Sequence, residues 1–199
     1  MTEAPGGPGV QVLRAATREA HARLDALVDL RSWNRATHEW WLQRMLGLHE
    51  PLEHELGVWR TAWVTPDRPH TPDVAVRRRA GAITADLITL GLTETQVRAL
   101  PRSPLPPAPT ERGRALGQLY VLDGSALGGA VIATHAIAGG IPPEACTSLA
   151  HSRERITSWR ETKNLLNELT GEELDRAVRA AVELFAVFEA WLRTPVPAR

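Results

Sequence analysis

Cysteine and lysine are almost absent from this 199-residue chain. Cys146 is the only cysteine, which excludes intramolecular disulfides, thiolate metal clusters and CxxC redox pairs. Such usage is typical of a reducing compartment, and we expect a cytoplasmic protein. Lys163 is the only lysine against 22 arginines, so a site that requires a cation will mostly use Arg.

Net charge and long apolar runs are also missing. The 23 basic residues balance 23 acidic ones, so no net field draws the chain to nucleic acid or to an anionic membrane. No stretch approaches the ~18 continuous apolar residues of a membrane-spanning helix. Residues 1–11 lack the basic start and apolar run of a signal peptide. We therefore expect neither nucleic acid nor membrane as a partner.

β-Strand patterns are missing as well, and helical periodicity takes their place. No run alternates β-branched and aromatic residues with polar ones. Apolar spacing predicts helices over 10–30, 36–63, the segment that ends at Leu90, 93–100, 110–138, 148–168 and 172–193, the last capped by Thr170 or Gly171. The proline-rich segment 101–109 predicts an extended connector. We expect an all-α architecture of six to eight helices: a single domain over 10–194, a disordered tail over 1–9 and a second tail over 195–199.

Three glycines interrupt one strongly helical segment, LYVLDGSALGGAVIATHA. Gly124, Gly128 and Gly129 each cost about 1 kcal/mol relative to alanine in a helix. Because Gly124 and Gly128 are four residues apart, they share a helix face that presents bare backbone. A closely packed helix would explain this face, and so would a flat ligand. A phosphate-binding loop is not indicated, because neither a preceding strand nor a GKS or GKT pattern is present.

The first predicted helix places His21 on an apolar stripe. Asp25 follows one turn later, within reach of a ring nitrogen. A carboxylate on one nitrogen fixes the tautomer and raises the basicity of the other, as a metal-ligating histidine requires. The position equally fits a histidine at the rim of the core. Arg14 and Arg18 lie near the same face, where they bind an anionic ligand or form its solvated side.

The other histidines form no HxxxH or HExxH pair. His49 and His54 diverge on a helix, and Glu50, Glu53 and Glu55 do not reproduce the inward Glu and ExxH repeats of a di-iron bundle. We therefore predict no di-iron site.

Two segments together resemble the haem oxygenase family. LRAATREAHARLD at 13–25 resembles its proximal helix, and LYVLDGSALGGAVIA at 119–133 resembles its distal helix. The GSxLGG form is similar to the bacterial subgroup found with bacteriophytochromes. Weaker similarity runs through MLGLHEPLE, ADLITLG and SWRETKNLLNEL, in the family's order. The resemblance implies a haem-oxygenase-like multi-helix fold, with haem between the proximal helix and a glycine-kinked distal helix.

The resemblance assigns roles to the histidine and the glycines. His21 matches the proximal ligand of the haem iron, the one metal ligand expected, and Asp25 matches the acid that orients it. Gly124 and Gly128 match the distal glycines that let the helix backbone lie on the haem face, and Gly129 follows as in the family.

The resemblance also implies where cations and pocket walls lie. Arg14 and Arg18 match basic positions near the haem propionates, and Arg160 or Lys163 is expected to supply the cation on the far side. The residues expected as pocket walls are Tyr120 and Phe188.

One position departs from the animal enzymes of the family. Ser125 stands where they carry the distal aspartate that organises water, and Asp123 lies about 160° away around the helix. Ser125 and the carbonyl groups exposed at the glycines are expected to hold the distal water instead. The alternative is slow or unproductive catalysis.

The resemblance implies that haem b is both cofactor and substrate, cleaved with O₂ to biliverdin, CO and ferrous iron. The chain carries no NADPH or flavin motif, so electrons come from an external donor, a ferredoxin or a reductase. A bacteriophytochrome is the expected acceptor of biliverdin, and the chain is expected to be a monomer or weak dimer. Two alternatives are a non-catalytic haem carrier or sensor that uses the same pocket, and a haem-free relative of thiaminase-like or quinone-cofactor enzymes.

Overall fold

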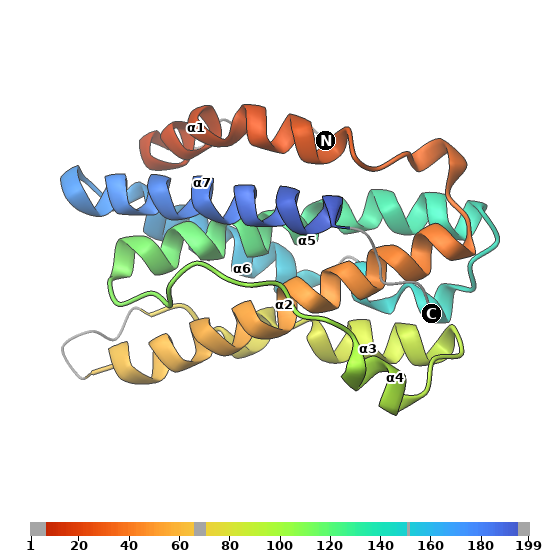
Figure 1. The fold of residues 1–199 in the computed structure, drawn as a ribbon. Coiled ribbons are helices and arrows are strands. Elements are labelled where there is room, and N and C mark those ends of the chain that lie inside the picture. Colours follow the sequence, from red (N-terminus) through yellow and green to blue (C-terminus); the bar gives the residue numbers. More distant parts are fainter. Residues whose placement is uncertain (1–6, 66–70, 151, 195–199) are drawn as a thin grey trace.

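A computed structural model describes residues 7–65, 71–150 and 152–194 of the chain (Figure 1). The regular structure in these ranges is entirely helical, so the all-α prediction is confirmed. The α-helices are α1 (Pro8–Asp25), α2 (Arg35–Trp63), α3 (Ala80–Thr89), α4 (Glu94–Ala99), α5 (Arg112–Ala138), α6 (Arg153–Asn167) and α7 (Gly171–Arg193). The 3-10 turns between them are η1 (Leu30–Ser32), η2 (Ala75–Arg77), η3 (Pro143–Ala145) and η4 (Thr147–Leu149).

Polar side chains and one glycine set several helix ends. The side chain of Asn34 accepts a hydrogen bond from the backbone of Thr37 and caps α2, and Thr93 forms a capping box at the start of α4. Gly91, which follows α3, has a φ of 98°, a left-handed conformation that favours glycine. These ends agree with the boundaries that the sequence predicts.

Some predicted boundaries are wrong. Helix α1 begins at Pro8, and Gly9 is buried so close to α6 that a Cβ there would lie 2.1 Å from the carbonyl oxygen of Leu166. The predicted disordered tail over 1–9 therefore extends too far, and its residues 1–6 lie outside the described part of the chain, as do 195–199. Thr170 occupies the N-cap position of α7, but its side chain makes no capping bond.

Two predicted helices are shorter in the structure. Helix α1 stops at Asp25 rather than Leu30, and α6 starts at Arg153 rather than Ser148. After α1 the chain forms an irregular turn and the 3-10 turn η1 begins only at Leu30, whereas the 3-10 turn η4 occupies Thr147–Leu149 before α6. The turn η4 buries Leu149, whereas η1 has no buried residue.

Helix α5 is the central element and packs against α6 and α7, while α1 packs on α7 (Figure 1). The approach of α5 to α7 is close because Gly113 and Gly117 have no side chain. A Cβ at either glycine would lie 2.2 Å from a backbone carbonyl oxygen of α7. The first half of α5 is therefore held directly against the α7 backbone.

A buried ion pair fixes α5 at the end of this packed half. The guanidinium of Arg77 donates to Asp123 over 3.1 Å, and the hydroxyl of Thr162 on α6 donates to the same carboxylate over 2.7 Å. Burial raises the pKa of Asp123, and the charge of Arg77 opposes that shift. The bonds tie η2, α5 and α6 together one residue before Gly124.

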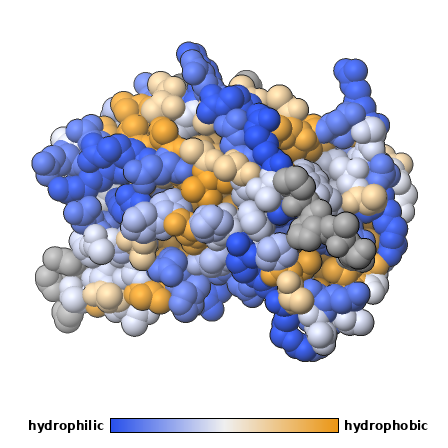
Figure 2. All heavy atoms as spheres, viewed as in Figure 1, coloured by the Kyte–Doolittle hydropathy of each residue, from blue (hydrophilic) through white to orange (hydrophobic). Residues whose placement is uncertain are grey.

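Helix α5 is also long and apolar enough, by length and composition alone, to cross a membrane. In this fold many of its apolar side chains are buried against neighbouring helices or line a cavity, whereas Ile137 is exposed. On the outside, Figure 2 shows hydrophilic side chains over much of one face, with apolar side chains gathered in patches between them.

Candidate functional site

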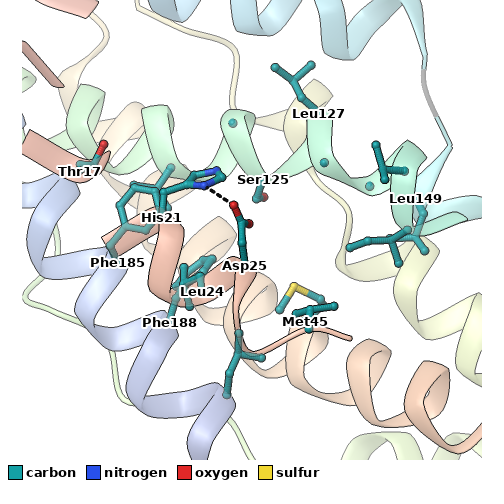
Figure 3. Close-up of a pocket in the computed structure, with 18 of the residues that line it drawn as sticks. Thr17, His21, Leu24, Asp25, Met45, Ser125, Leu127, Leu149, Phe185 and Phe188 are labelled. Atoms are coloured by element: carbon teal, nitrogen blue, oxygen red, sulfur yellow. Dashed lines mark hydrogen bonds and ion pairs between the residues drawn. The ribbon is translucent and has the colours of Figure 1, made fainter. Parts of the chain in front are cut away.

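A cavity of about 730 Å³ lies between α1, α5 and α7 (Figure 3). Small-molecule sites have volumes of roughly 300–1,000 Å³, so a ligand with tens of heavy atoms fits here. The predicted site residues that line the cavity are Arg14, Arg18, His21, Asp25, Tyr120, Gly124, Ser125, Gly128, Gly129 and Phe188. Sequence segments about 100 residues apart thus contribute to one site.

His21 and Asp25 form a pair at the α1 wall. The ring Nδ1 of His21 lies 2.9 Å from Oδ2 of Asp25, and the side chains are 64% and 70% exposed (Figure 3). The ring centroid is 6.0 Å from that of Phe185 on α7. Within the described residues, Nε2 of His21 has no hydrogen-bond partner, so this nitrogen is available to a ligand. Asp25 reaches the ring directly and needs no bridging group.

The glycines of the α5 wall face open space. A Cβ at Gly124 or Gly128 would meet no atom within 4 Å, and both residues line the cavity. Gly129 differs, because its Cβ would lie 3.1 Å from the carbonyl oxygen of Leu149 in η4. The bare face formed by Gly124 and Gly128 is therefore directed at a ligand space. The other explanation, a closely packed helix, applies to Gly113 and Gly117.

The predicted cations are not all at the cavity. Arg14 and Arg18 line it from α1, the first half-buried and the second exposed. Arg160 is exposed on a separate groove, and the ammonium of Lys163 lies 5.4 Å from the ring centroid of Trp159, outside the cavity lining. Trp159 is the α6 side chain that lines the cavity, so a far-side cation from Arg160 or Lys163 stays a prediction.

The sequence missed a buried polar cluster behind α5, made of His49, Glu53 and Arg79. The ring Nδ1 of His49 lies 3.1 Å from Glu53, and the Glu53 carboxylate also accepts the backbone N–H of Arg79 over 2.7 Å. Burial lowers the pKa of His49, and the charge of Arg79 adds to that effect. The only signal in the sequence is the four-residue spacing of His49 and Glu53.

Arg79 brings this cluster to the cavity wall. Its Nη1 lies 3.4 Å from the hydroxyl oxygen of Ser125 and 3.5 Å from Nε2 of His49, and its Nε donates to the carbonyl oxygen of Ser148. The Ser125 hydroxyl donates its own proton to the carbonyl oxygen of Leu122 over 2.7 Å. The polar part of the α5 wall thus combines a serine oxygen with a buried guanidinium.

Apolar and aromatic side chains complete the walls. Tyr120 and Trp159, whose ring centroids are 5.6 Å apart, lie beside each other at one side of the cavity. The further lining residues that the sequence analysis did not single out as site residues are Thr17, Leu24, Val28, Leu30, Trp41, Met45, Val121, Leu127, Val131, Ile132, Leu149, Phe185 and Leu192. Such walls suit a large, mostly apolar ligand with a few charged groups.

Comparison with known proteins agrees with this description. The family model described as heme oxygenase matches residues 10–194. The fold is similar to crystal structures of the NO- and CO-bound heme oxygenase from Neisseria meningitidis, with 25% sequence identity and a TM-score of 0.69. The match covers 96% of this chain and 92% of that one. No curated protein matches the chain by sequence.

Proposed function

This chain belongs to the haem oxygenase family and is an enzyme of haem degradation, and we propose that it cleaves haem b with O₂ to biliverdin, CO and ferrous iron. One observation carries the proposal. A single cavity has a histidine with an available Nε2 on one wall and a helix face without side chains on another. A planar macrocycle with a central metal fits between two such walls.

The α1 wall supplies the iron ligand in this proposal. His21 binds the iron through Nε2, and Asp25 holds the ring by accepting the proton on Nδ1. That hydrogen bond fixes the tautomer in which Nε2 carries a lone pair. Arg14 and Arg18, on the same helix, hold the propionates, because they are the cations that line the cavity from this side.

The α5 wall shapes the opposite side. At Gly124 and Gly128 the absence of side chains would let the backbone lie close to a bound macrocycle and leave space beside the iron only for a small ligand such as O₂. The oxygen of Ser125 accepts a hydrogen bond from the distal water, because its own proton is donated to Leu122. Apolar walls exclude bulk water from the reacting edge of the ring.

The remaining partners follow from the chemistry. Cleavage consumes electrons, and we propose a ferredoxin or a reductase as their source. A bacteriophytochrome is the proposed acceptor of biliverdin, on the ground of the GSxLGG segment at 124–129. We further propose that the protein acts in the cytoplasm, as a monomer or weak dimer.

Titration of the purified protein with hemin, followed by ascorbate or a ferredoxin system in air, tests the proposal. Catalase removes free peroxide, which degrades haem without an enzyme. We expect stoichiometric growth of the Soret band, then its loss and a broad biliverdin absorption in the red. His21→Ala should lower turnover by ~100-fold or more, since loss of even a supporting contact to a metal ligand costs 10- to 100-fold.

His54→Ala is the matched control, because His54 is exposed on α2 and does not line the cavity. This variant should bind and consume hemin like the wild type. Binding without consumption would identify a haem carrier or sensor that uses the same cavity. Absence of a Soret shift would contradict both functions.

A further inference from the structure

Arg79 is a buried cation at the cavity wall whose guanidinium has only neutral hydrogen-bond partners. It is 4% exposed. Its guanidinium contacts are the carbonyl oxygen of Ser148, the ring of His49 and the hydroxyl oxygen of Ser125. Among the described residues, no carboxylate lies within ion-pair distance of the guanidinium. A buried charge without a counter-ion costs free energy, so an unpaired one at a ligand site requires explanation.

Arg77, two residues earlier, shows the usual solution. Its guanidinium is equally buried, and it pairs with Asp123 over 3.1 Å and with Glu161 over 2.7 Å. The acid nearest to Arg79 is Glu53, which is engaged elsewhere. Its carboxylate accepts the backbone N–H groups of Arg79 and Ala80 and the ring of His49.

Arg79 remains cationic although its surroundings lower its pKa. Burial lowers the pKa of Arg79 to about 10, and Arg155 on α6 acts in the same direction, whereas Glu53 on α2 and Asp86 on α3 oppose the shift. A guanidinium with this pKa is protonated at neutral pH. The Asp86 carboxylate is itself occupied by the backbone of Thr147 and Ser148. Glu53 and Asp86 offset part of the charge from a distance, and the guanidinium itself reaches Ser125 at the cavity wall.

We propose that Arg79 is a positioning residue that favours a negatively charged ligand on the distal side of the bound haem. The inference rests on the proposed haem-binding function. Arg79 acts through Ser125, whose hydroxyl proton is committed to Leu122, and through its own charge behind α5. A charge in such a low-dielectric wall stabilises an anion more strongly than the same charge in water.

The proposal also explains serine at position 125. An aspartate there would place a carboxylate beside the guanidinium of Arg79, which now lies 3.4 Å from the serine oxygen, and would offset its charge. Serine leaves the charge available. Ser125→Asp should therefore weaken the preference for anions, as removal of Arg79 does.

Ligand binding to the ferric haem complex provides the test. Fluoride is the anionic probe and imidazole is the neutral one. The ratio of their dissociation constants measures the effect of the Arg79 charge, because a change in pocket shape would affect both ligands. Arg79→Met should weaken fluoride relative to imidazole by about tenfold or more, the scale of one hydrogen bond to a charged group. It should also raise the pKa at which the iron-bound water deprotonates. Arg79→Lys keeps the charge and should restore most of the ratio.

Arg44→Met is the control, because Arg44 is 2% exposed, lies over the ring of Trp191 and does not line the cavity. It removes a buried guanidinium from another place and should leave the ratio unchanged. Ser125→Asp gives an independent result if Arg79→Met does not fold. Equal ratios in the wild type and in Ser125→Asp or Arg79→Met would overturn this inference alone. A wild type that binds no hemin would overturn it together with the proposed function.

Discussion

The cavity wall and the packed core of this molecule contain the same two sequence patterns. In each region a histidine precedes an acid by four residues on one helix. His21 and Asp25 at the wall are 64% and 70% exposed, whereas His49 and Glu53 in the core are 0% and 5% exposed. Both nitrogens of His49 are engaged, one by Glu53 and one by Arg79, but His21 keeps Nε2 available.

The second shared pattern is a pair of glycines four residues apart on α5. Gly113 and Gly117 allow the α7 backbone to come so close that a Cβ would overlap it, and Gly124 and Gly128 leave space that nothing in the described chain fills. The spacing of the glycines determines which face of the helix is bare. The elements packed around the helix determine whether that face contacts another helix or borders a ligand space. Variants of the four pairs can separate these roles.

The histidines should give the largest contrast in stability. His49→Ala should lower the free energy of unfolding by about 2–4 kcal/mol, because it leaves a cavity and a buried Glu53 carboxylate without one of its donors. His21→Ala should change it by less than about 0.5 kcal/mol, since the side chain is exposed. Urea unfolding of the haem-free proteins measures both. Equal losses in the two variants would remove the distinction between wall and core.

The glycines should give the next largest contrast. Gly117→Ala should cost about 1–3 kcal/mol, because its Cβ would lie 2.2 Å from the carbonyl oxygen of Ala177 and the helices must separate. Gly128→Ala should stabilise the haem-free protein by up to about 1 kcal/mol through helix propensity, yet weaken hemin binding. Thermal unfolding and hemin titration of each variant supply the two readouts. A Gly128→Ala variant with unchanged hemin affinity would argue against close approach at α5.

The smallest effect concerns pH. Burial holds the pKa of His49 below its usual 6.5, so the unfolded chain binds a proton there that the folded chain does not. This contribution to stability is complete above pH 6.5 and is lost as pH falls from there toward the lowered pKa. The slope from one such histidine is at most about 1.4 kcal/mol per pH unit.

His49→Gln should therefore flatten the fall in stability between pH 7 and 5. Some slope should remain, because burial also lowers the pKa of His38. Asp123, whose pKa is raised, contributes equally to the pH dependence of stability in the wild type and in the variant, so it does not affect the difference between their slopes. Urea unfolding at several pH values measures the slope, and identical slopes for wild type and variant would refute the assignment.

The same contrast shows what a sequence can predict. Helical periodicity and the His21–Asp25 spacing depend on neighbours along the chain, so the helices and the histidine–acid pair could be anticipated. That two of the helices form the walls of one cavity was implied only by the resemblance to the haem oxygenase family. The glycine face could be located but not interpreted, because its environment is a tertiary property. Only the fold distinguishes Gly124, which faces open space, from Gly117, which lies against α7.

The buried cluster was beyond such reasoning for a related reason. Glu53 and Arg79 belong to different elements, and their contact depends on how α2 and α3 pack. Arg160 and Lys163 illustrate the converse. The resemblance of this segment to a family at low identity does not determine which face of α6 turns toward the cavity. It therefore could not show that neither of the two cations belongs to the cavity lining.

Helix α5 is held in place by contacts near both of its ends. Its first half is clamped by α7 and by the Arg77–Asp123 ion pair, and at its far end Gly139 lies against the carbonyl oxygen of Trp33. The span between these supports carries Gly124 and Gly128. Because packing fixes both ends of the helix, we expect any adjustment of α5 to a bound ligand to be a local bend between Gly124 and Gly128 rather than a rotation of the whole helix.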